Sequence, residues 1–252
     1  MFKNLTKEKL RKGQAVLGTF FNSYSPDVAE MLGAAGLDFI IIDCEHGPGS
    51  PETVVNCVRA AEARGMTPVV RITEDTRTGI LRYLDIGAHG ILVPQLENSK
   101  QAEQVVKYSK YSPEGMRGMA VPRASSWGMD GHDYTRIENE ETLICVQCEN
   151  VSCLNEIEAV AKVPGIDLIF LGPYDMSQAL GVPGQIKHPL MLDAEKRILN
   201  AAKEAGISAG IFVGDIDAAL KSREEGWNLI LMSMDIQTLG AAYKRSVEIF
   251  SK

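Results

Sequence analysis

The chain has 252 residues, of which 45% are hydrophobic and 23% are charged, and its formal net charge at pH 7 is −7. This length suits one barrel-type α/β domain spanning residues 1–252, and the composition is that of an ordinary soluble protein. The negative charge argues against nucleic acid as a partner, because no basic stripe is available to neutralise phosphates. Apolar runs such as FIII before Asp43 are too short to cross a membrane, and the N-terminus lacks a signal core, so we expect a cytoplasmic protein.

Eight short apolar runs alternate with amphipathic segments along the chain. Continuous apolar runs of this kind are typical of parallel strands that are buried on both faces. We therefore expect strands at residues 16–21, 38–43, 68–72, 90–94, 143–149, 167–172, 209–213 and 229–233.

The segments between these runs carry the boundary signals of helices. A serine followed by a proline predicts a helix start at Ser25-Pro26 and at Ser50-Pro51. A glycine shortly before the next run predicts a helix end at four positions, Gly36, Gly87, Gly206 and Gly226. Eight strand-helix units predict a closed (β/α)8 barrel, with residues 111–141 as a long excursion between the fourth helix and the fifth strand.

Polar side chains follow the carboxyl ends of the runs, where the active sites of such barrels lie. This set comprises Asn22, Ser23, Asp43, Glu45, His46, Arg71, Gln95, Gln147, Glu149 and Asp175. Alternation along the fifth strand places Gln147 and Glu149 on one face. The pattern therefore predicts that a base, a cation, amides and carboxylates converge on one rim.

Two carboxylates stand out in this set. Glu149 closes the run LICVQC, Asp175 follows the run DLIFLG, and the segment between them has the helical spacing of Leu154, Ile157, Val160 and Ala161. A right-handed crossover makes the two strands parallel, so that both carboxylates face the same edge of the sheet. Two unpaired anions would repel each other there, and a hard divalent cation is the usual reason to bring them together. Helix capping by either acid is the alternative.

Four residues of this set have both a functional and a structural interpretation. His46 follows a buried strand, between a carboxylate and a glycine-rich turn, which favours a general base over a solvated loop residue. Asp43 and Glu45 are either loop caps or residues that orient His46. Arg71 ends an apolar strand, where a charge is costly unless it is paired, so an anionic ligand or an internal carboxylate is expected.

Several motifs are absent from the sequence. No lysine ends a strand run, so a Schiff-base mechanism lacks its nucleophile. Neither G-x-G-x-x-G after the first run nor G-x-S-x-G occurs, which disfavours dinucleotide redox chemistry and serine hydrolysis. The odd number of cysteines, five, suggests reduced thiols, and strand alternation places Cys145 and Cys148 on opposite faces, against a redox or zinc role. Metal-assisted carbon chemistry remains.

The sequence resembles the HpcH/HpaI aldolase family over nearly its whole length. The resemblance rests on the motifs IIDCEHGP, PVVRI, GILVPQLEN, PEGMRGMAVPRASSWG, VQCEN and IFLGPYDMSQALGVPGQIKHP, taken in this order. It implies a class II aldolase on a (β/α)8 barrel that uses Mg²⁺, Mn²⁺ or Co²⁺. It also implies a hexamer, built as a trimer of dimers that exchange a C-terminal helix.

The resemblance also implies roles for individual residues. Glu149 and Asp175 match the metal ligands, His46 matches the base, and Arg71 matches the arginine that stabilises the enolate. Gln147, with Tyr174 and Asp175, matches the pyruvate-binding positions.

Two matches and three departures complete the comparison with the family pattern. Asp85 matches an aspartate that raises the basicity of the histidine, across a subunit interface, and Arg123 matches a recurrent loop arginine. Cys148, Asn150 and Tyr174 depart from the family pattern. A tyrosine beside Asp175 narrows the expected pocket, which bears on substrate choice.

The expected reaction is the reversible cleavage of a 4-hydroxy-2-oxo acid to pyruvate and an aldehyde. One alternative keeps the site but acts on a CoA thioester or a phosphoenolpyruvate-type substrate. The other alternative is a barrel that binds a small oxo acid without catalysis. His46 distinguishes the non-catalytic barrel from an aldolase, because a protein that only binds the oxo acid needs no base.

Overall fold

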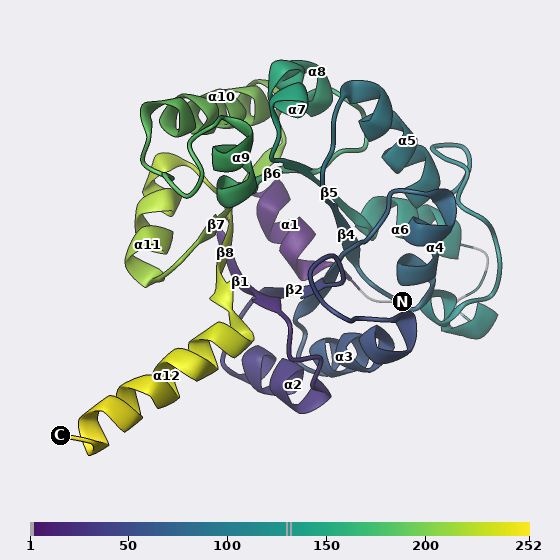
Figure 1. Ribbon diagram of the computed structural model, residues 1–252. Helices are drawn as coiled ribbons and strands as arrows, with labels where there is room; N and C mark the ends of the chain where they lie inside the picture. Colours follow the sequence, from purple (N-terminus) through teal and green to yellow (C-terminus); the bar gives the residue numbers. More distant parts are fainter. Residues whose placement is uncertain (1–2, 130, 132) are drawn as a thin grey trace.

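The computed structural model describes residues 3–129, 131 and 133–252, and eight parallel strands form its centre. Each strand pairs with the next along the chain, and the last pairs with the first, which closes the barrel (Figure 1). The strands are β1 (Val16–Phe21), β2 (Phe39–Asp43), β3 (Thr67–Arg71), β4 (Gly90–Val93), β5 (Leu143–Cys148), β6 (Leu168–Leu171), β7 (Ser208–Val213) and β8 (Leu229–Met234). The predicted (β/α)8 barrel is confirmed, and each predicted strand boundary lies within one residue of the observed one.

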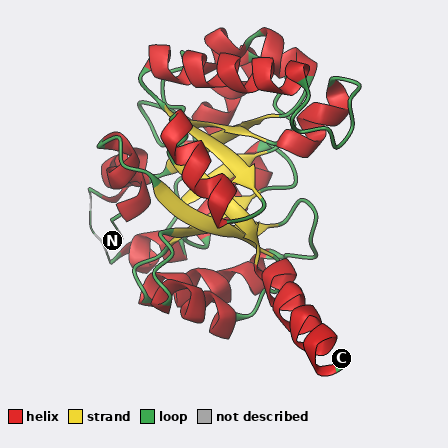
Figure 2. Ribbon diagram, turned by 90° about the vertical axis from the view of Figure 1, so that its left-hand side faces the viewer, coloured by secondary structure: helices red, strands yellow, loops and turns green. Residues whose placement is uncertain are grey.

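Helices surround the barrel, as Figures 1 and 2 show. Both serine-proline pairs stand at helix starts, and Gly206 and Gly226 end their helices in the left-handed conformation, as predicted. The helices are α1 (Leu5–Arg11), α2 (Pro26–Ala34), α3 (Pro51–Ala63), α4 (Arg77–Asp85), α5 (Ser99–Ser109), α6 (Tyr134–Glu141), α7 (Val151–Asn155), α8 (Ile157–Ala161), α9 (Pro173–Ala179), α10 (Pro189–Ala205), α11 (Ile216–Glu225) and α12 (Asp235–Phe250), with the 3-10 helix η1 (Arg123–Gly128).

The segment between β5 and β6 differs from the single helix that its spacing predicts. It forms two short helices, α7 and α8, which meet at Glu156, where φ is −106° and ψ is 13°. The Glu156 carboxylate accepts hydrogen bonds from the backbone nitrogen and the hydroxyl of Ser99, at 3.0 and 2.9 Å. This tertiary contact accompanies the break. The predicted excursion contains η1 and α6, and residues 130 and 132 of it lie outside the described residues.

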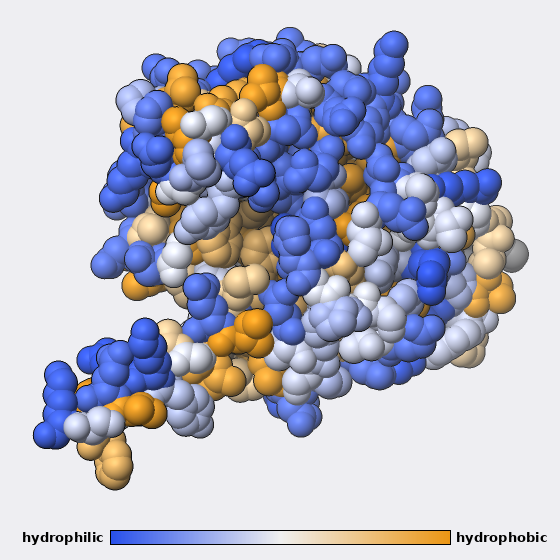
Figure 3. Space-filling model, in the orientation of Figure 1, coloured by the Kyte–Doolittle hydropathy of each residue, from blue (hydrophilic) through white to orange (hydrophobic). Residues whose placement is uncertain are grey.

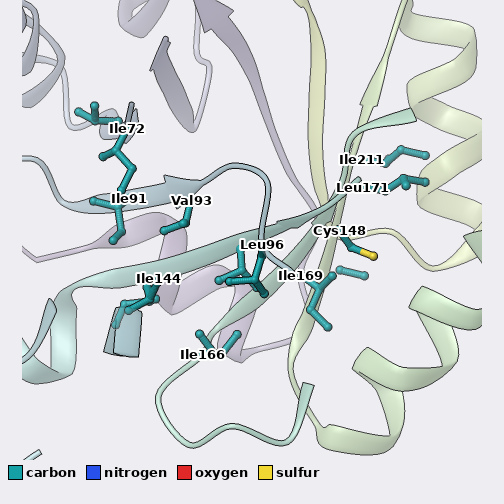
Figure 4. Packing of buried hydrophobic residues seen from close by; sticks show 14 of the residues in the cluster. Ile72, Ile91, Val93, Leu96, Ile144, Cys148, Ile166, Ile169, Leu171 and Ile211 are labelled. Carbon is teal, nitrogen blue, oxygen red and sulfur yellow. The ribbon is translucent and has the colours of Figure 1, made fainter. Parts of the chain in front are cut away.

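The core has two layers, because successive strand residues point to opposite faces. The barrel interior holds side chains such as Ile41, Leu92 and Phe170, whereas the larger layer lies between the strands and the helices. Figure 4 shows part of this outer layer. Cys145 belongs to the inner layer and Cys148 to the outer one, as the alternation predicts, and all five cysteines are free thiols.

Helix α1, which the sequence pattern did not reveal, covers the amino ends of the strands. Asn4, its N-cap, donates to the carbonyl of His89, which immediately precedes β4. The buried ammonium of Lys7 lies 2.5 Å from the carbonyl of Thr142 and 2.7 Å from Oδ2 of Asp167. Because α1 closes this end, the opposite, carboxyl end of the barrel is the accessible one.

Helix α12 projects away from the barrel (Figures 1 and 2). The surface of this protruding arm carries both hydrophobic and hydrophilic residues (Figure 3). Within the part of the chain that the structure describes, no helix has the length and apolar character needed to cross a membrane.

Candidate active site

A pocket of about 280 Å³ opens at the carboxyl end of the barrel. Its polar lining is His46, Arg71, Gln147, Asp175 and Gln237, and its apolar lining includes Phe20, Phe170, Tyr174, Phe212 and Met234. The structure thus brings together the predicted base, arginine, amide and one carboxylate. Three larger hollows lie beside α1, beside η1 at the amino end, and between α10 and α11, but none of them is lined by residues from the carboxyl ends of the strands.

Arg71 and Asp43 form a buried bidentate ion pair beneath this pocket. Arg71 Nε lies 2.9 Å from Asp43 Oδ1, and Nη2 lies 2.7 Å from Oδ2, which also accepts from the amide of Asn22. Burial alone would raise the pKa of Asp43, but the bonds and charge of Arg71 outweigh it and lower that pKa below its usual value. The guanidinium also lies 4.4 Å from the centroid of the Phe20 ring. The expected internal carboxylate for Arg71 is therefore Asp43.

Asp43 also organises the turn that carries His46. Its Oδ1 accepts hydrogen bonds from the backbone nitrogens of Glu45 and His46, at 3.1 and 3.2 Å. The His46 ring is 63% exposed, and its Nε2 lies 3.8 Å from Glu45 Oε2, which is itself 3.2 Å from Arg71 Nη1. That last contact is an ion pair without a well-aligned hydrogen bond, since Oε2 has no hydrogen-bond partner among the described residues. Glu45 thus links the arginine to the histidine, and burial raises the pKa of its carboxyl group.

Glu149 is a buried carboxylate held by two neutral donors. Its Oε1 accepts from the backbone nitrogen of Gln95 at 2.6 Å, and its Oε2 accepts from Gln147 Nε2 at 2.8 Å. Burial raises the pKa of Glu149 to about 7; the Gln95 bond opposes this effect, and the negative charge of Asp175 adds to it. No lysine or arginine of the described residues forms an ion pair with Glu149. The anion is therefore costly as it stands, and a bound cation would relieve that cost.

The surroundings of Glu149 fit a divalent cation. Gly172 leaves space beside the carboxylate, because a Cβ there would lie 2.6 Å from Glu149 Oε2. Gln147 Oε1 is buried and has no hydrogen-bond partner among the described residues. Asp175 lies in the first turn of α9, and its side chain is exposed in the pocket. Carboxylate and amide oxygens are the ligands that hard cations prefer.

The described residues contain no group of three or more histidines, cysteines or acids that could enclose a metal ion. A cation held by Glu149 and Asp175 would therefore complete its coordination with oxygens of water or substrate, as Mg²⁺ commonly does.

Two predicted site residues, Asp85 and Arg123, lie outside the pocket. Asp85 ends α4 and accepts from Arg117 Nη2 at 2.8 Å, and Arg123 in η1 pairs with Glu62 and donates to the carbonyl of Ile86 at 3.1 Å. A helix that follows a barrel strand runs back to the amino end, so Asp85 lies there and not at the carboxyl-end pocket. Within one chain neither residue lines the pocket of His46.

Sequence reasoning missed several residues of the site. Its position after a strand is the only sequence signal for Gln95, yet the backbone nitrogen of this residue donates to Glu149. The φ of Gln95 is 51°, in the left-handed region. The aromatic wall of Phe20 and Phe212 comes from inward positions of β1 and β7, which strand alternation could have identified. Asp235, the first residue of α12, accepts from the backbone nitrogens of residues 22 and 23. The only sequence feature that could have identified Asp235 is its position, as an acid directly after the last strand.

The family model of HpcH/HpaI aldolase/citrate lyase matches residues 16–242. The chain belongs to the HpcH/HpaI family. The expectation that it is an aldolase of this family, a lyase, is thereby confirmed.

Two curated family relatives are similar over almost their full length. The hydroxypyruvate/pyruvate aldolase of Paraburkholderia phytofirmans is 33% identical, with 98% of this chain and 97% of the relative covered. The 2-keto-3-deoxy-L-rhamnonate aldolase of Klebsiella pneumoniae is 31% identical, with 99% and 94% covered.

A solved structure of the family has the same architecture. The HpcH/HpaI aldolase/citrate lyase family protein of Burkholderia cenocepacia superposes with a TM-score of 0.94 at 34% identity. The match covers 99% of this chain and 100% of that chain.

Proposed function

We propose that this HpcH/HpaI family member is a class II aldolase that needs a divalent metal and reversibly cleaves a 4-hydroxy-2-oxo acid to pyruvate and an aldehyde. Three features of the described residues carry this proposal: the buried Glu149 carboxylate has no ion pair with a lysine or arginine, the charge of Asp175 lies near it, and Oε1 of Gln147 has no hydrogen-bond partner. The names of both curated relatives, one of them a pyruvate aldolase, support the reaction class.

Glu149 and Asp175 would hold the ion, with Mg²⁺, Mn²⁺ and Co²⁺ as the candidates. When bound, such a cation supplies Lewis acidity for the negative charge that develops on the substrate as its C3–C4 bond breaks. Protonation of Glu149 competes with the ion, since burial raises the pKa of this carboxyl group to about 7.

Arg71 is the protein's own donor for the developing charge. Its guanidinium is fixed by two hydrogen bonds to Asp43, so it needs little reorganisation as the charge forms. A preorganised donor of this kind is typically worth about 3 kcal/mol in the transition state. Gln147 and the residues Tyr174 and Asp175 at the start of α9 would bind the carboxylate end of the oxo acid.

His46 would accept the proton of the 4-hydroxyl group, directly or through a water molecule. Its ring lines the pocket and is open to solvent, as a base that exchanges protons with water must be. Glu45, at 3.8 Å, would stabilise the imidazolium that results.

The assembly is proposed to be a hexamer, a trimer of dimers that exchange α12. Apolar side chains of α12 recur at three- and four-residue spacing and are exposed: Ile236, Leu239, Tyr243, Val247 and Phe250. A stripe of this kind on a projecting helix is typical of a protein interface. In such an assembly, Asp85 would act on the site of a neighbouring subunit.

The alternative reaction on a CoA thioester has less support. Apart from Arg71, no lysine or arginine of the described residues lines the pocket, so no basic groove meets the CoA phosphates.

A panel of 4-hydroxy-2-oxo acids tests the proposal through coupled detection of pyruvate. Pyruvate release should require added Mn²⁺ or Mg²⁺, stop with a chelator, and disappear in Glu149→Ala while the barrel remains folded. His46→Ala should slow release without loss of oxo acid binding. Release that survives complete chelation would contradict the metal mechanism, and an unimpaired His46→Ala variant would favour a base-independent reaction. Binding of the oxo acid without any pyruvate release by the wild-type protein would favour the non-catalytic reading.

A further inference from the structure

The turn that carries His46, residues 44–50, is held from beneath by Tyr24. The Tyr24 hydroxyl donates to the carbonyl of Asp43, immediately before this turn. The turn also wraps the phenol closely: a Cβ at Gly47 would overlap the Tyr24 hydroxyl, and one at Gly49 would lie 2.6 Å from the ring. Burial raises the pKa of Tyr24 to about 12, so the hydroxyl keeps the proton that it donates.

The backbone of Tyr24 is in an unusual conformation. Its φ is 52°, in the left-handed region, which costs a non-glycine residue about 1 kcal/mol or more. Such a conformation persists only where the surroundings hold it. The residues just before Tyr24 provide that restraint.

Asp235, which lies near the C-terminal end of the sequence, fixes Asn22 and Ser23, the two residues before Tyr24. Its carboxylate accepts hydrogen bonds from the backbone nitrogens of Asn22 at 2.8 Å and Ser23 at 3.1 Å. Asp235 is the first residue of α12 and is 9% exposed. Its neighbours Met234 and Gln237 line the pocket, so the first turn of α12 is part of the pocket wall.

We propose that Tyr24 and Asp235 are positioning residues for His46: Asp235 holds residues 22–23, these present Tyr24, and Tyr24 holds the turn of residues 44–50. The inference rests on the proposed function in that His46 is the base. In addition, the first residue of α12, the helix that projects from the barrel, would determine the position of the His46 ring.

The geometry around His46 explains why its placement depends on this relay. The ring is 63% exposed and lies 3.8 Å from Glu45, so the side chain is not packed into the core. Its position is instead determined by the backbone of the turn, through the bonds of Asp43 to the nitrogens of Glu45 and His46. A misplacement of about 1 Å in a reacting group can cost up to about a hundredfold in rate.

Two reactions that pass through the same pyruvate enolate would separate base positioning from enolate formation at this site. Cleavage of a 4-hydroxy-2-oxo acid breaks C3–C4, sends the bonding electrons into the pyruvate enolate, and releases the hydroxyl proton to a base. Decarboxylation of oxaloacetate breaks the corresponding C–C bond, releases CO2 and leaves the same enolate, which then takes a proton at C3. No hydroxyl proton is removed in the second reaction. The ratio of the two kcat values therefore reports on His46, because effects on metal or enolate cancel.

The test compares Tyr24→Phe and Asp235→Asn with wild type in both reactions. We expect the ratio of cleavage to decarboxylation to fall about tenfold in each variant, through kcat more than KM, and His46→Ala to set the lower limit. Tyr134→Phe and Asp215→Ala are matched controls, since they remove a buried hydroxyl contact with Tyr111 and a capping bond at the start of α11, both outside the pocket. The ratio should stay within twofold in these controls.

Amide hydrogen exchange of Glu45 and His46 supplies a second readout that needs no turnover. Exchange at these two amides should accelerate in Tyr24→Phe and Asp235→Asn but not in the controls. Unchanged exchange and an unchanged ratio in the two variants, with a lowered ratio in His46→Ala, would overturn the inference. A wild-type protein that performs neither reaction would refute the proposed function, and the exchange data would then still decide whether Tyr24 holds the turn.

Discussion

Gln147 donates from Nε2 to Glu149 Oε2 over 2.8 Å, and its own Oε1 stays buried without a hydrogen-bond partner among the described residues. The orientation follows from the network, because the amide oxygen would be repelled by the carboxylate. An unsatisfied buried acceptor is costly unless a ligand pairs with it. Gln147 lines the pocket, so this pair places a buried amide oxygen at the pocket wall with the Glu149 carboxylate directly behind it.

Gln147→Leu should raise KM for the oxo acid at least about tenfold, because it removes the amide from the pocket and a donor from Glu149. Steady-state kinetics at saturating Mn²⁺ measure the change. Gln101→Leu is a matched control, since Gln101 bonds Asp75 outside the pocket. A KM within twofold of wild type for Gln147→Leu would remove Gln147 from the binding site.

Arg71→Lys should lower kcat about a hundredfold or more, although the charge is kept. A lysine cannot reproduce the bidentate pair with Asp43 or the planar donor set. Arg197 makes the same bidentate pair with Glu158 on the surface, at 2.7 and 2.8 Å, so Arg197→Lys is the control. Nearly equal rates for the two variants would mean that Arg71 is only a structural partner of Asp43.

Tyr174→Ala should widen the range of aldehydes. Tyr174 is 55% exposed at the pocket, and its ring lies 6.2 Å from the Phe212 ring at an angle of 59°. We expect the ratio of kcat/KM for a bulky over a small aldehyde, condensed with pyruvate, to rise about tenfold. Tyr174→Phe should keep the wild-type ratio. A ratio that is unchanged in the alanine variant would show that this side chain does not limit the pocket.

Glu195→Gln should stabilise the protein at alkaline pH. Burial, and then the charge of Glu225, raises the pKa of Glu195 to about 7, above its ordinary value of 4.5. The folded state therefore binds this proton more tightly than the unfolded chain, and stability falls as pH rises from about 4.5 to about 7. Thermal unfolding should show Glu195→Gln gaining in Tm over wild type at pH 8 and little at pH 4.5. An equal gain at both pH values would contradict a titration at this residue.

The barrel was predictable from the sequence because each strand is buried on both faces and thus reads as an unbroken apolar run. The ion pair of Arg71 was predictable for a similar reason, since a charge at the end of a buried strand needs a partner. Active sites of such barrels lie at the carboxyl ends of the strands, and this predicts that His46, Gln147 and Asp175 share one pocket, as they do.

Other features depend on contacts between residues far apart in sequence, which local patterns do not reveal. The break at Glu156 accompanies a contact with Ser99, and α1 covers the barrel through bonds to Thr142 and Asp167. Asp235 contacts residues more than two hundred positions earlier. Asp85 was expected to act on His46, but in one chain it pairs with Arg117, so that role stays a prediction for a neighbouring subunit.

The central claim is that Glu149 and Asp175 jointly hold a divalent cation, and direct titration with Mn²⁺ tests it. Electron paramagnetic resonance at pH 8, where Glu149 is largely ionised, should detect one bound Mn²⁺ per chain in the wild-type protein, and binding should weaken below pH 7. Glu149→Gln and Asp175→Asn should each abolish it, while Glu158→Gln on the surface should not. Mn²⁺ binding of wild-type strength in both Glu149→Gln and Asp175→Asn, or none in the wild-type protein with pyruvate present, would contradict the account.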